Sequence, residues 1–171
     1  TRQGRGSGGV LVMVRNALKR FVHTVNVTVD NAVLLRFDKE AFGFGRDVLF
    51  CGAYVPPYDS PYYSQEHVTV CCNITALEQC ILDCCRSFGQ SCYYLLTGDF
   101  YARTGRQNAM SHDLEDDTDS IVQSDLYTYR ESEDTVITTF GRQLLEFCSA
   151  CDLTILNGTC VGDERGRYTY I

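Results

Sequence analysis

The sequence contains no apolar run that approaches the roughly 18 residues needed for a membrane-spanning helix. We also expect no signal peptide at the start, because residues 1–9 are polar, basic and rich in glycine. We therefore expect no membrane partner. With 171 residues, of which 44% are hydrophobic and 22% charged, the chain has the length and balance of a single globular domain.

Histidine and paired C-x-x-C motifs are scarce. The three histidines are His23, His67 and His112, and His112 lies in an acidic stretch where we expect it to be solvated. Of the ten cysteines, Cys148 and Cys151 form a lone C-x-x-C pair, whereas zinc sites usually show a second pair. The chain is too long and too rich in ordinary core residues to require a disulfide scaffold. We therefore expect reduced thiols that pack as small hydrophobes, with disulfides or a metal site as the alternatives.

Negative charge dominates, but it is concentrated in one segment. The net charge is −7, and residues 112–134 contain nine acids and one base, Arg130. Because aliphatic residues are also few there, the region of about 102–133 is predicted to be an exposed acidic loop. Residues 1–20 instead carry five bases and no acid, which suits either contact with nucleic-acid phosphate or a solvated surface. The total charge argues against a strong nonspecific DNA binder.

Apolar residues recur with the period of strands in the first half of the chain. Residues 23–29 alternate valine with polar side chains, Asp30-Asn31 marks a turn, and Pro56-Pro57 ends a later apolar run. The predicted strands span residues 8–15, 23–29, 32–37, 47–55, 92–100 and 153–156, with a last strand from Tyr168.

Two helices are predicted from the spacing of apolar residues. The capping-box pattern Thr75-x-x-Glu78 predicts the start of the first helix, and Gly89 predicts its end. The second helix has one apolar face, made of Val136, Ile137, Phe140, Leu144, Phe147, Cys148 and Cys151. Hairpin strands followed by a strand-helix-strand-helix-strand order indicate an α/β fold, with a mixed sheet and helices packed outside it.

Three segments with chemically capable residues lie at the ends of predicted strands, at 53–57, 96–103 and 155–159. Ligands of open α/β sheets gather at such strand ends. Asp99 closes an apolar strand, so its carboxylate is held rigidly and suits a Mg²⁺ ligand or a base aimed at water. Taken alone, each of these residues also has an ordinary interpretation. Asp99 would then belong to a Gly-Asp turn, and Tyr54 would be an edge residue with a hydrated hydroxyl.

Four motifs, taken in order, carry a family resemblance. They are Ser7-Gly8-Gly9-Val10, Tyr54-Val55-Pro56-Pro57, Gly98-Asp99-Phe100-x-Ala102-Arg103-Thr104-Gly105 and Ile155-Leu156-Asn157-Gly158. Their order resembles the endonuclease/exonuclease/phosphatase superfamily, most closely the endonuclease domains of non-LTR retrotransposons. The resemblance implies a four-layered α/β sandwich, in which two mixed sheets are flanked by helices. Over residues 1–171 that domain is expected to be incomplete at both ends, because the chain begins without Met and ends inside a predicted strand.

The resemblance implies a phosphodiesterase that uses Mg²⁺, acts on DNA in its intact form and is nuclear or cytoplasmic. Carried over by position, Asp99 is the metal-side or water-orienting carboxylate and Tyr54 is the phosphate-side tyrosine. Tyr101 stands where the family has the asparagine of its Gly-Asp-x-Asn segment. Arg103 lies beyond that segment and is assigned either to phosphate or to the surface.

Departures from the family pattern predict that this chain does not hydrolyse a phosphodiester on its own. The phenol of Tyr101 is bulkier than an amide and donates one hydrogen bond where the amide donates two. The family's N-terminal asparagine and glutamate would precede Thr1, and its C-terminal aspartate and histidine would follow Ile171. The three histidines of this chain occupy none of the family's motif positions.

Other readings remain open. A phosphatase of the same fold, acting on lipid or inositol phosphates, would share the sheet and the metal chemistry. Residues 102–105 and 156–158 favour the retroelement kind by resemblance. A decayed reading frame, or a domain kept for binding, would account for Tyr101. A zinc module built on Cys148 and Cys151 is the remaining alternative.

Overall fold

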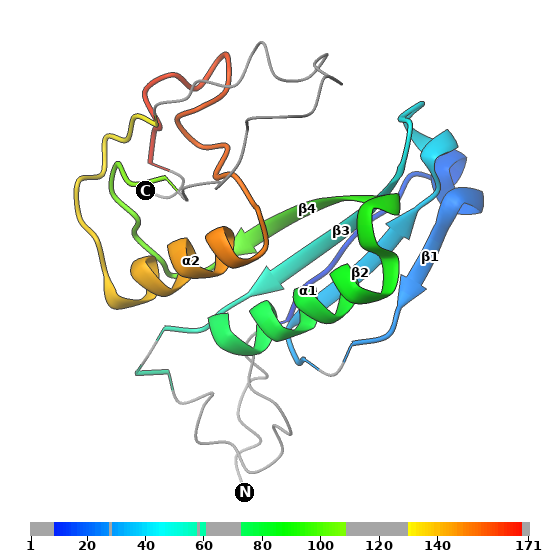
Figure 1. The fold of residues 1–171 in the computed structure, drawn as a ribbon, viewed down its shortest axis with the longest axis horizontal. Helices are drawn as coiled ribbons and strands as arrows, with labels where there is room; N and C mark the ends of the chain where they lie inside the picture. The colour runs from blue at the N-terminus through cyan, green and yellow to red at the C-terminus, as the bar shows by residue number, and fades with distance from the viewer. Residues whose placement is uncertain (1–8, 28, 58, 61–72, 109–129, 169–171) are drawn as a thin grey trace, which may run out of the picture. The chain divides into compact units, whose positions relative to one another are not determined.

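The computed structural model describes residues 9–27, 29–57, 59–60, 73–108 and 130–168, which belong to two compact units, 1–101 and 102–171. The first unit contains a mixed sheet in the order β1-β2-β3-β4 (Figure 1). The strands are β1 (Val22–Val25), β2 (Ala32–Phe37), β3 (Asp47–Tyr54) and β4 (Cys92–Asp99). Neighbouring strands are antiparallel except β3 and β4, which are parallel. The predicted α/β class with a mixed sheet is therefore confirmed.

The parallel pair requires a crossover, and helix α1 (Ile74–Phe88) lies in it. Leu77 and Ile81 are fully buried on the predicted apolar face of this helix. Gly89 ends the helix at φ 54°, as predicted. The predicted capping box at Thr75 is wrong, because Asn73 is the N-cap and its side chain accepts the N–H of Ala76. Asparagine caps a helix as well as threonine does, so the earlier residue starts it.

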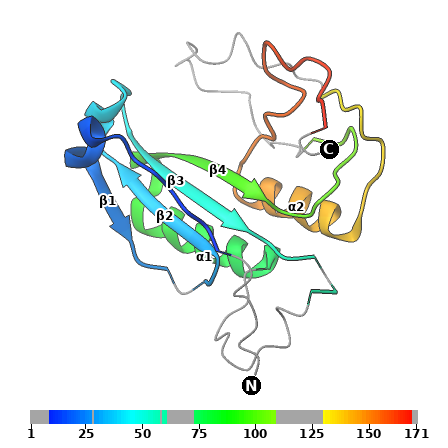
Figure 2. The ribbon, with the colours of Figure 1, turned by 180° about the vertical axis from the view of Figure 1, so that it is seen from behind.

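The sheet has two differently covered faces. Helix α1 lies against one face, and residues 9–15 run along the other (Figure 2). The predicted strand over 8–15 is wrong for the described residues 9–15, which pair with no strand. These residues cross the face of the sheet instead of adding to its edge, and a β-carbon on Gly52 would lie 3.2 Å from Val10 Cγ1. The outward side chains Leu11 and Met13 are 82% and 86% exposed.

The first hairpin forms largely as the valine alternation predicts. Strand β1 pairs antiparallel with β2 through the turn at Asp30-Asn31. Asn31 has φ 60°, a left-handed conformation that asparagine tolerates better than most residues. Strand β1 ends at Val25 and is shorter than the predicted 23–29, although Val29 is still buried.

The second unit is built around helix α2 (Thr139–Ala150), whose N-cap Thr138 accepts the N–H of Gly141. Phe147 is fully buried on its predicted apolar face. The predicted strand over 153–156 is wrong, because these residues pair with no strand; the turn at 157–158 is confirmed. Tyr168 also lies outside any strand, and the rest of the predicted last strand lies outside the described residues.

The described residues of the predicted exposed loop over about 102–133 are of both kinds. Arg106, Gln107 and Glu133 are exposed, as expected, whereas Thr104, Arg130 and Ser132 are only 5–6% exposed. Arg130 is buried among acceptors of this region, which include Thr104 Oγ1 and the carbonyl of Gly105. Residues 109–129, which hold most of the acidic run, lie outside the described residues.

Candidate functional site

Tyr54 and Asp99 form the last residue pair of the parallel β3–β4 ladder. Paired residues of neighbouring strands lie side by side on one face of the sheet. The structure therefore brings together the two residues to which the sequence assigned the phosphate side and the metal side of a site. Both stand at the carboxyl ends of parallel strands, where open α/β sheets hold ligands.

Gly98 allows the two strand ends to approach closely. Its φ is 146°, and a β-carbon there would lie 1.8 Å from the carbonyl oxygen of Ala53. Only glycine fits this position. The contact between the strands continues one residue further, because the Val55 N–H donates to the carbonyl of Asp99 over 2.8 Å. The backbone at Asp99 is thus fixed by the close contact of the preceding Gly98 and by the hydrogen bond to the carbonyl of Asp99 itself.

Tyr101 completes the cluster. Its backbone N–H donates to Asp99 Oδ1 over 3.1 Å, which orients the carboxylate. Its ring meets the ring of Tyr54 nearly edge to face, with the centroids 6.2 Å apart and an interplanar angle of 79°. Tyr101 has φ 45°, in the left-handed region, and is 48% exposed. Asp99 is exposed as well, so a ligand reaches the carboxylate from solvent.

The surroundings of Tyr54 keep its hydroxyl protonated. Burial raises the pKa of Tyr54 above its ordinary value, the neighbouring Tyr101 raises it further, and Asp99 adds a smaller increase. A phenol in this state donates a hydrogen bond, which is the role required to hold a phosphate oxygen.

The donor set suits a magnesium ion only in part. Mg²⁺ is commonly held by one or two carboxylates together with waters and substrate phosphates. Asp99 supplies one such carboxylate. Among the residues that the structure describes, no three His, Cys, Asp or Glu side chains gather into a metal site. A metal at Asp99 would therefore depend on the phosphate that it shares.

Among the residues that the structure describes, no cysteine or histidine belongs to the cluster of Tyr54, Asp99 and Tyr101. Cys71 and Cys72 lie outside the described residues. His23 lies on β1, at the opposite edge of the sheet from β4, with Nε2 3.0 Å from the Asp38 carboxylate. This pair was not predicted. His67 and His112 lie outside the described residues.

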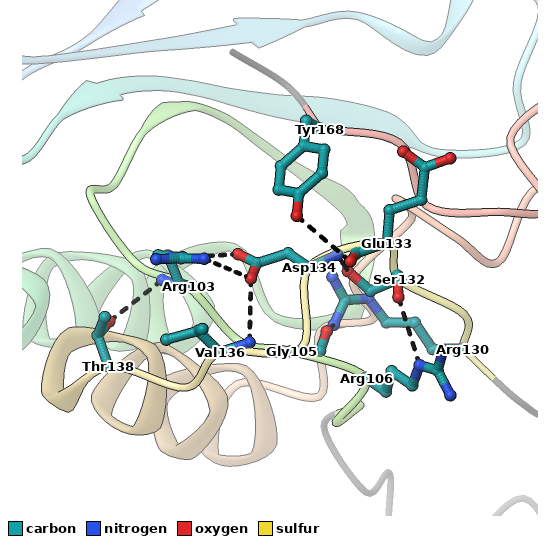
Figure 3. Close-up of polar contacts among 10 residues, drawn as sticks. All are labelled: Arg103, Gly105, Arg106, Arg130, Ser132, Glu133, Asp134, Val136, Thr138 and Tyr168. Atoms are coloured by element: carbon teal, nitrogen blue, oxygen red, sulfur yellow. Dashed lines mark hydrogen bonds and ion pairs between the residues drawn. The ribbon is translucent and has the colours of Figure 1, made fainter. Parts of the chain in front are cut away.

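A second polar cluster, in the unit 102–171, is centred on Arg130 (Figure 3). The residue Arg130 is 5% exposed, and its guanidinium group donates to neutral acceptors. The acceptors are Thr104 Oγ1, the carbonyls of Gly105 and Gln107, and both the carbonyl and Oδ1 of Asn157. Burial lowers the pKa of Arg130. The sequence offered one signal, a single base inside an acidic stretch, but no way to tell which groups it contacts.

Arg103 is engaged within the protein. It donates two hydrogen bonds to the Asp134 carboxylate, over 2.8 and 2.7 Å, in the planar two-pronged geometry of strong arginine–carboxylate pairs (Figure 3). Hydrogen bonding from Arg103 is the main reason why the pKa of Asp134 is lowered. The sequence assigned Arg103 either to phosphate or to the surface, and its pairing with Asp134 was not predicted.

No protein-family model, curated protein or solved structure matches this chain. The family resemblance is therefore carried by the motifs of the sequence alone. Over the described residues, no helix is both long and apolar enough to cross a membrane.

Proposed function

We propose that this chain is part of a metal-dependent phosphodiesterase, a DNA endonuclease of the retroelement kind with the four-layered α/β fold. The observation that carries the proposal is the pairing of Tyr54 with Asp99 at the ends of two parallel strands. A phosphodiester needs a hydrogen-bond donor for its oxygens and a carboxylate-held cation for its charge. The pair supplies the donor and the carboxylate at one place.

Each residue of the cluster has a distinct role in this proposal. Asp99 would hold Mg²⁺ through its carboxylate, and the ion would supply electrostatic stabilisation of charge on the phosphate oxygens. The Tyr54 hydroxyl, protonated at neutral pH, donates to a phosphate oxygen. The Tyr101 N–H keeps the Asp99 carboxylate in one orientation. The preorganised positions of these groups avoid the cost of arranging them when the ligand arrives.

Tyr101 favours binding over hydrolysis. An amide at its position would donate to the charge that develops on the phosphate, and loss of one such donor typically lowers the rate about 10²–10³-fold. We therefore propose that the chain binds a phosphodiester and hydrolyses it poorly or not at all. A domain kept for binding is the second candidate, and Tyr101 is the observation that favours it.

Manganese in place of magnesium tests the metal site directly, because Mn²⁺ broadens the NMR signals of nearby nuclei. With a thymidine dinucleotide present to supply the shared phosphate, we expect Mn²⁺ to broaden the ring signals of Tyr54 and Tyr101 selectively, and Asp99→Asn to remove the effect. Asp30→Asn, at the exposed turn between β1 and β2, is the matched control and is expected to change nothing. Broadening that is absent, or that persists unchanged in Asp99→Asn, would contradict the proposal.

A plasmid-nicking assay tests the hydrolytic part separately. With Mg²⁺ present, we expect the chain to produce no nicks above background. Rapid nicking that Asp99→Ala abolishes would support the phosphodiesterase class but overturn the role given to Tyr101. Nicking that survives Asp99→Ala would identify a contaminating nuclease and is the reason for including the variant.

A further inference from the structure

The backbone of Tyr101 adopts a conformation that its side chain disfavours. At φ 45° the β-carbon crowds the following carbonyl group, a cost that glycine avoids and asparagine tolerates better than other residues. Three described non-glycine residues have positive φ, and the other two are Asn31 and Asp152, which are of the tolerant kinds. Tyr101 is therefore the bulky exception, and backbone strain of this sort clusters at active sites and ligand-binding sites.

Core packing does not explain why a tyrosine stands there. The residue is 48% exposed, so about half of its apolar surface gains nothing from burial. Its ring is nevertheless held in place, because it meets Tyr54 nearly edge to face. A rigid aromatic ring that is exposed to solvent offers a contact surface with little conformational freedom left to lose on binding.

The neighbours of the ring specify what such a surface would bind. Asp99, oriented by the Tyr101 N–H, stands on one side as the proposed ligand of the metal ion through which the phosphate is held. A ligand that combines a charged phosphodiester with a flat π-system matches this pairing of groups. A nucleotide has both, and stacking of a base on an aromatic side chain tolerates any base. In a duplex each base is already stacked on its neighbours, so only an unpaired base has a face to offer.

We infer that Tyr101 is a stacking platform for an unpaired base of single-stranded or locally opened nucleic acid. The inference rests on the proposed phosphodiester site and names the substrate class that this site takes. Binding requires a divalent cation, because the Asp99 carboxylate repels a phosphate in the absence of one. In this arrangement Tyr101 selects the ligand through its base, and Asp99 and Tyr54 hold the phosphodiester.

The test is an NMR titration of the whole chain, in Mg²⁺, with two probes. One probe is a thymidine dinucleotide, and the other is the same sugar-phosphate dinucleotide without bases. We expect the base-containing probe to bind roughly 5- to 150-fold more tightly, which corresponds to the energies of single base–aromatic contacts. Tyr101→Gly is expected to abolish the difference, and Tyr101→Phe to keep it. Tyr93→Ala, which removes a tyrosine that is 45% exposed elsewhere on β4, is the matched control and is expected to keep it too.

Tyr101→Gly removes the strained β-carbon, so the variant is expected to fold, and its unfolding curve verifies this. Equal affinities for the two probes in the native chain would overturn the platform and leave the phosphodiester site standing. Tighter binding of a duplex than of a single strand of the same sequence would also overturn the platform. If neither probe binds and Asp99→Asn leaves the Mn²⁺ broadening unchanged, the proposed function fails together with this inference.

Discussion

Gly98 lies against the carbonyl oxygen of Ala53 so closely that a β-carbon on Gly98 would be 1.8 Å from that oxygen. The contact joins β3 to β4 one residue before the pair formed by Tyr54 and Asp99. Glycine at this position is thus a requirement of the site, because any larger residue pushes the two strand ends apart and separates the residues that follow.

Gly98→Ala is predicted to destabilise the chain by at least about 2 kcal/mol, because it combines a positive φ with a steric clash against backbone. Gly45→Ala is the matched control, since a β-carbon there meets no atom within 4 Å. We expect the control to change stability by less than about 0.5 kcal/mol. Urea unfolding of the three proteins measures both values. Equal stabilities of Gly98→Ala and the native chain would show that the strand ends are not in contact.

Tyr54 is predicted to ionise above pH 10.0, its ordinary pKa, because burial, Tyr101 and Asp99 all raise its pKa. A raised pKa in the folded state means that the protonated phenol stabilises the fold below pH 10.0. This stabilisation is lost as the pH rises through the folded-state pKa. Tyr101→Phe is expected to lower the pKa of Tyr54 more than Asp99→Asn does, because Tyr101 is the larger contributor. An NMR titration that follows the ring carbons of Tyr54 measures its pKa in both variants. A larger decrease in Asp99→Asn than in Tyr101→Phe would contradict the observed arrangement.

Arg130→Met is predicted to destabilise the chain by about 3 kcal/mol, because it leaves buried carbonyl and hydroxyl acceptors without a donor. Arg130→Lys is expected to recover little, since an ammonium group cannot reach the planar set of acceptors that a guanidinium group spans. Arg165→Met, at an exposed position, is the control. Chemical denaturation gives the three values, and a loss below about 1 kcal/mol for Arg130→Met would argue that the group is solvated.

The sequence predicts well those parts of the fold that depend on local pattern. Strand β2 coincides with the predicted 32–37, and Gly89 ends α1, because alternation and glycine conformation act over a few residues. The adjacency of Tyr54 and Asp99 was expected from two strand ends and one family resemblance. The cluster at Arg130 could not be predicted in this way. Its hydrogen bonds join residues 23–27 positions apart, and no periodicity in the sequence specifies which carbonyl groups will face a distant arginine.

The same limit applies to residues 9–15. Their alternating valines have the period of a strand, and Val12 and Val14 do pack on the core formed by Leu35, Phe37 and Val48. A strand also needs an edge with which to pair, and here the segment crosses the face of the sheet. A two-residue alternation of apolar side chains therefore predicts which side chains point inward, but it does not predict whether the backbone pairs with another strand.

Asp134 is predicted to make the unit 102–171 sensitive to acid. The pKa of this carboxylate is lowered below 3.8, chiefly by its hydrogen bonds from Arg103. A lowered pKa in the folded state means that the stabilising contribution is present above the unfolded-state pKa and is lost as the pH falls through the folded-state pKa.

Arg103→Lys replaces two directed hydrogen bonds with a point charge, and we expect it to cost on the order of 1 kcal/mol at neutral pH, since Arg103 is partly exposed. The difference from the native chain is expected to shrink as the pH falls through the folded-state pKa of Asp134, because the protonated carboxyl no longer benefits from the guanidinium group. Urea unfolding at neutral and acidic pH measures both quantities, and Arg106→Lys, whose pairing with Glu131 is longer and more exposed, serves as the control. A difference that stayed constant down to pH 2 would show that Arg103 stabilises the unit by packing and not through the carboxylate.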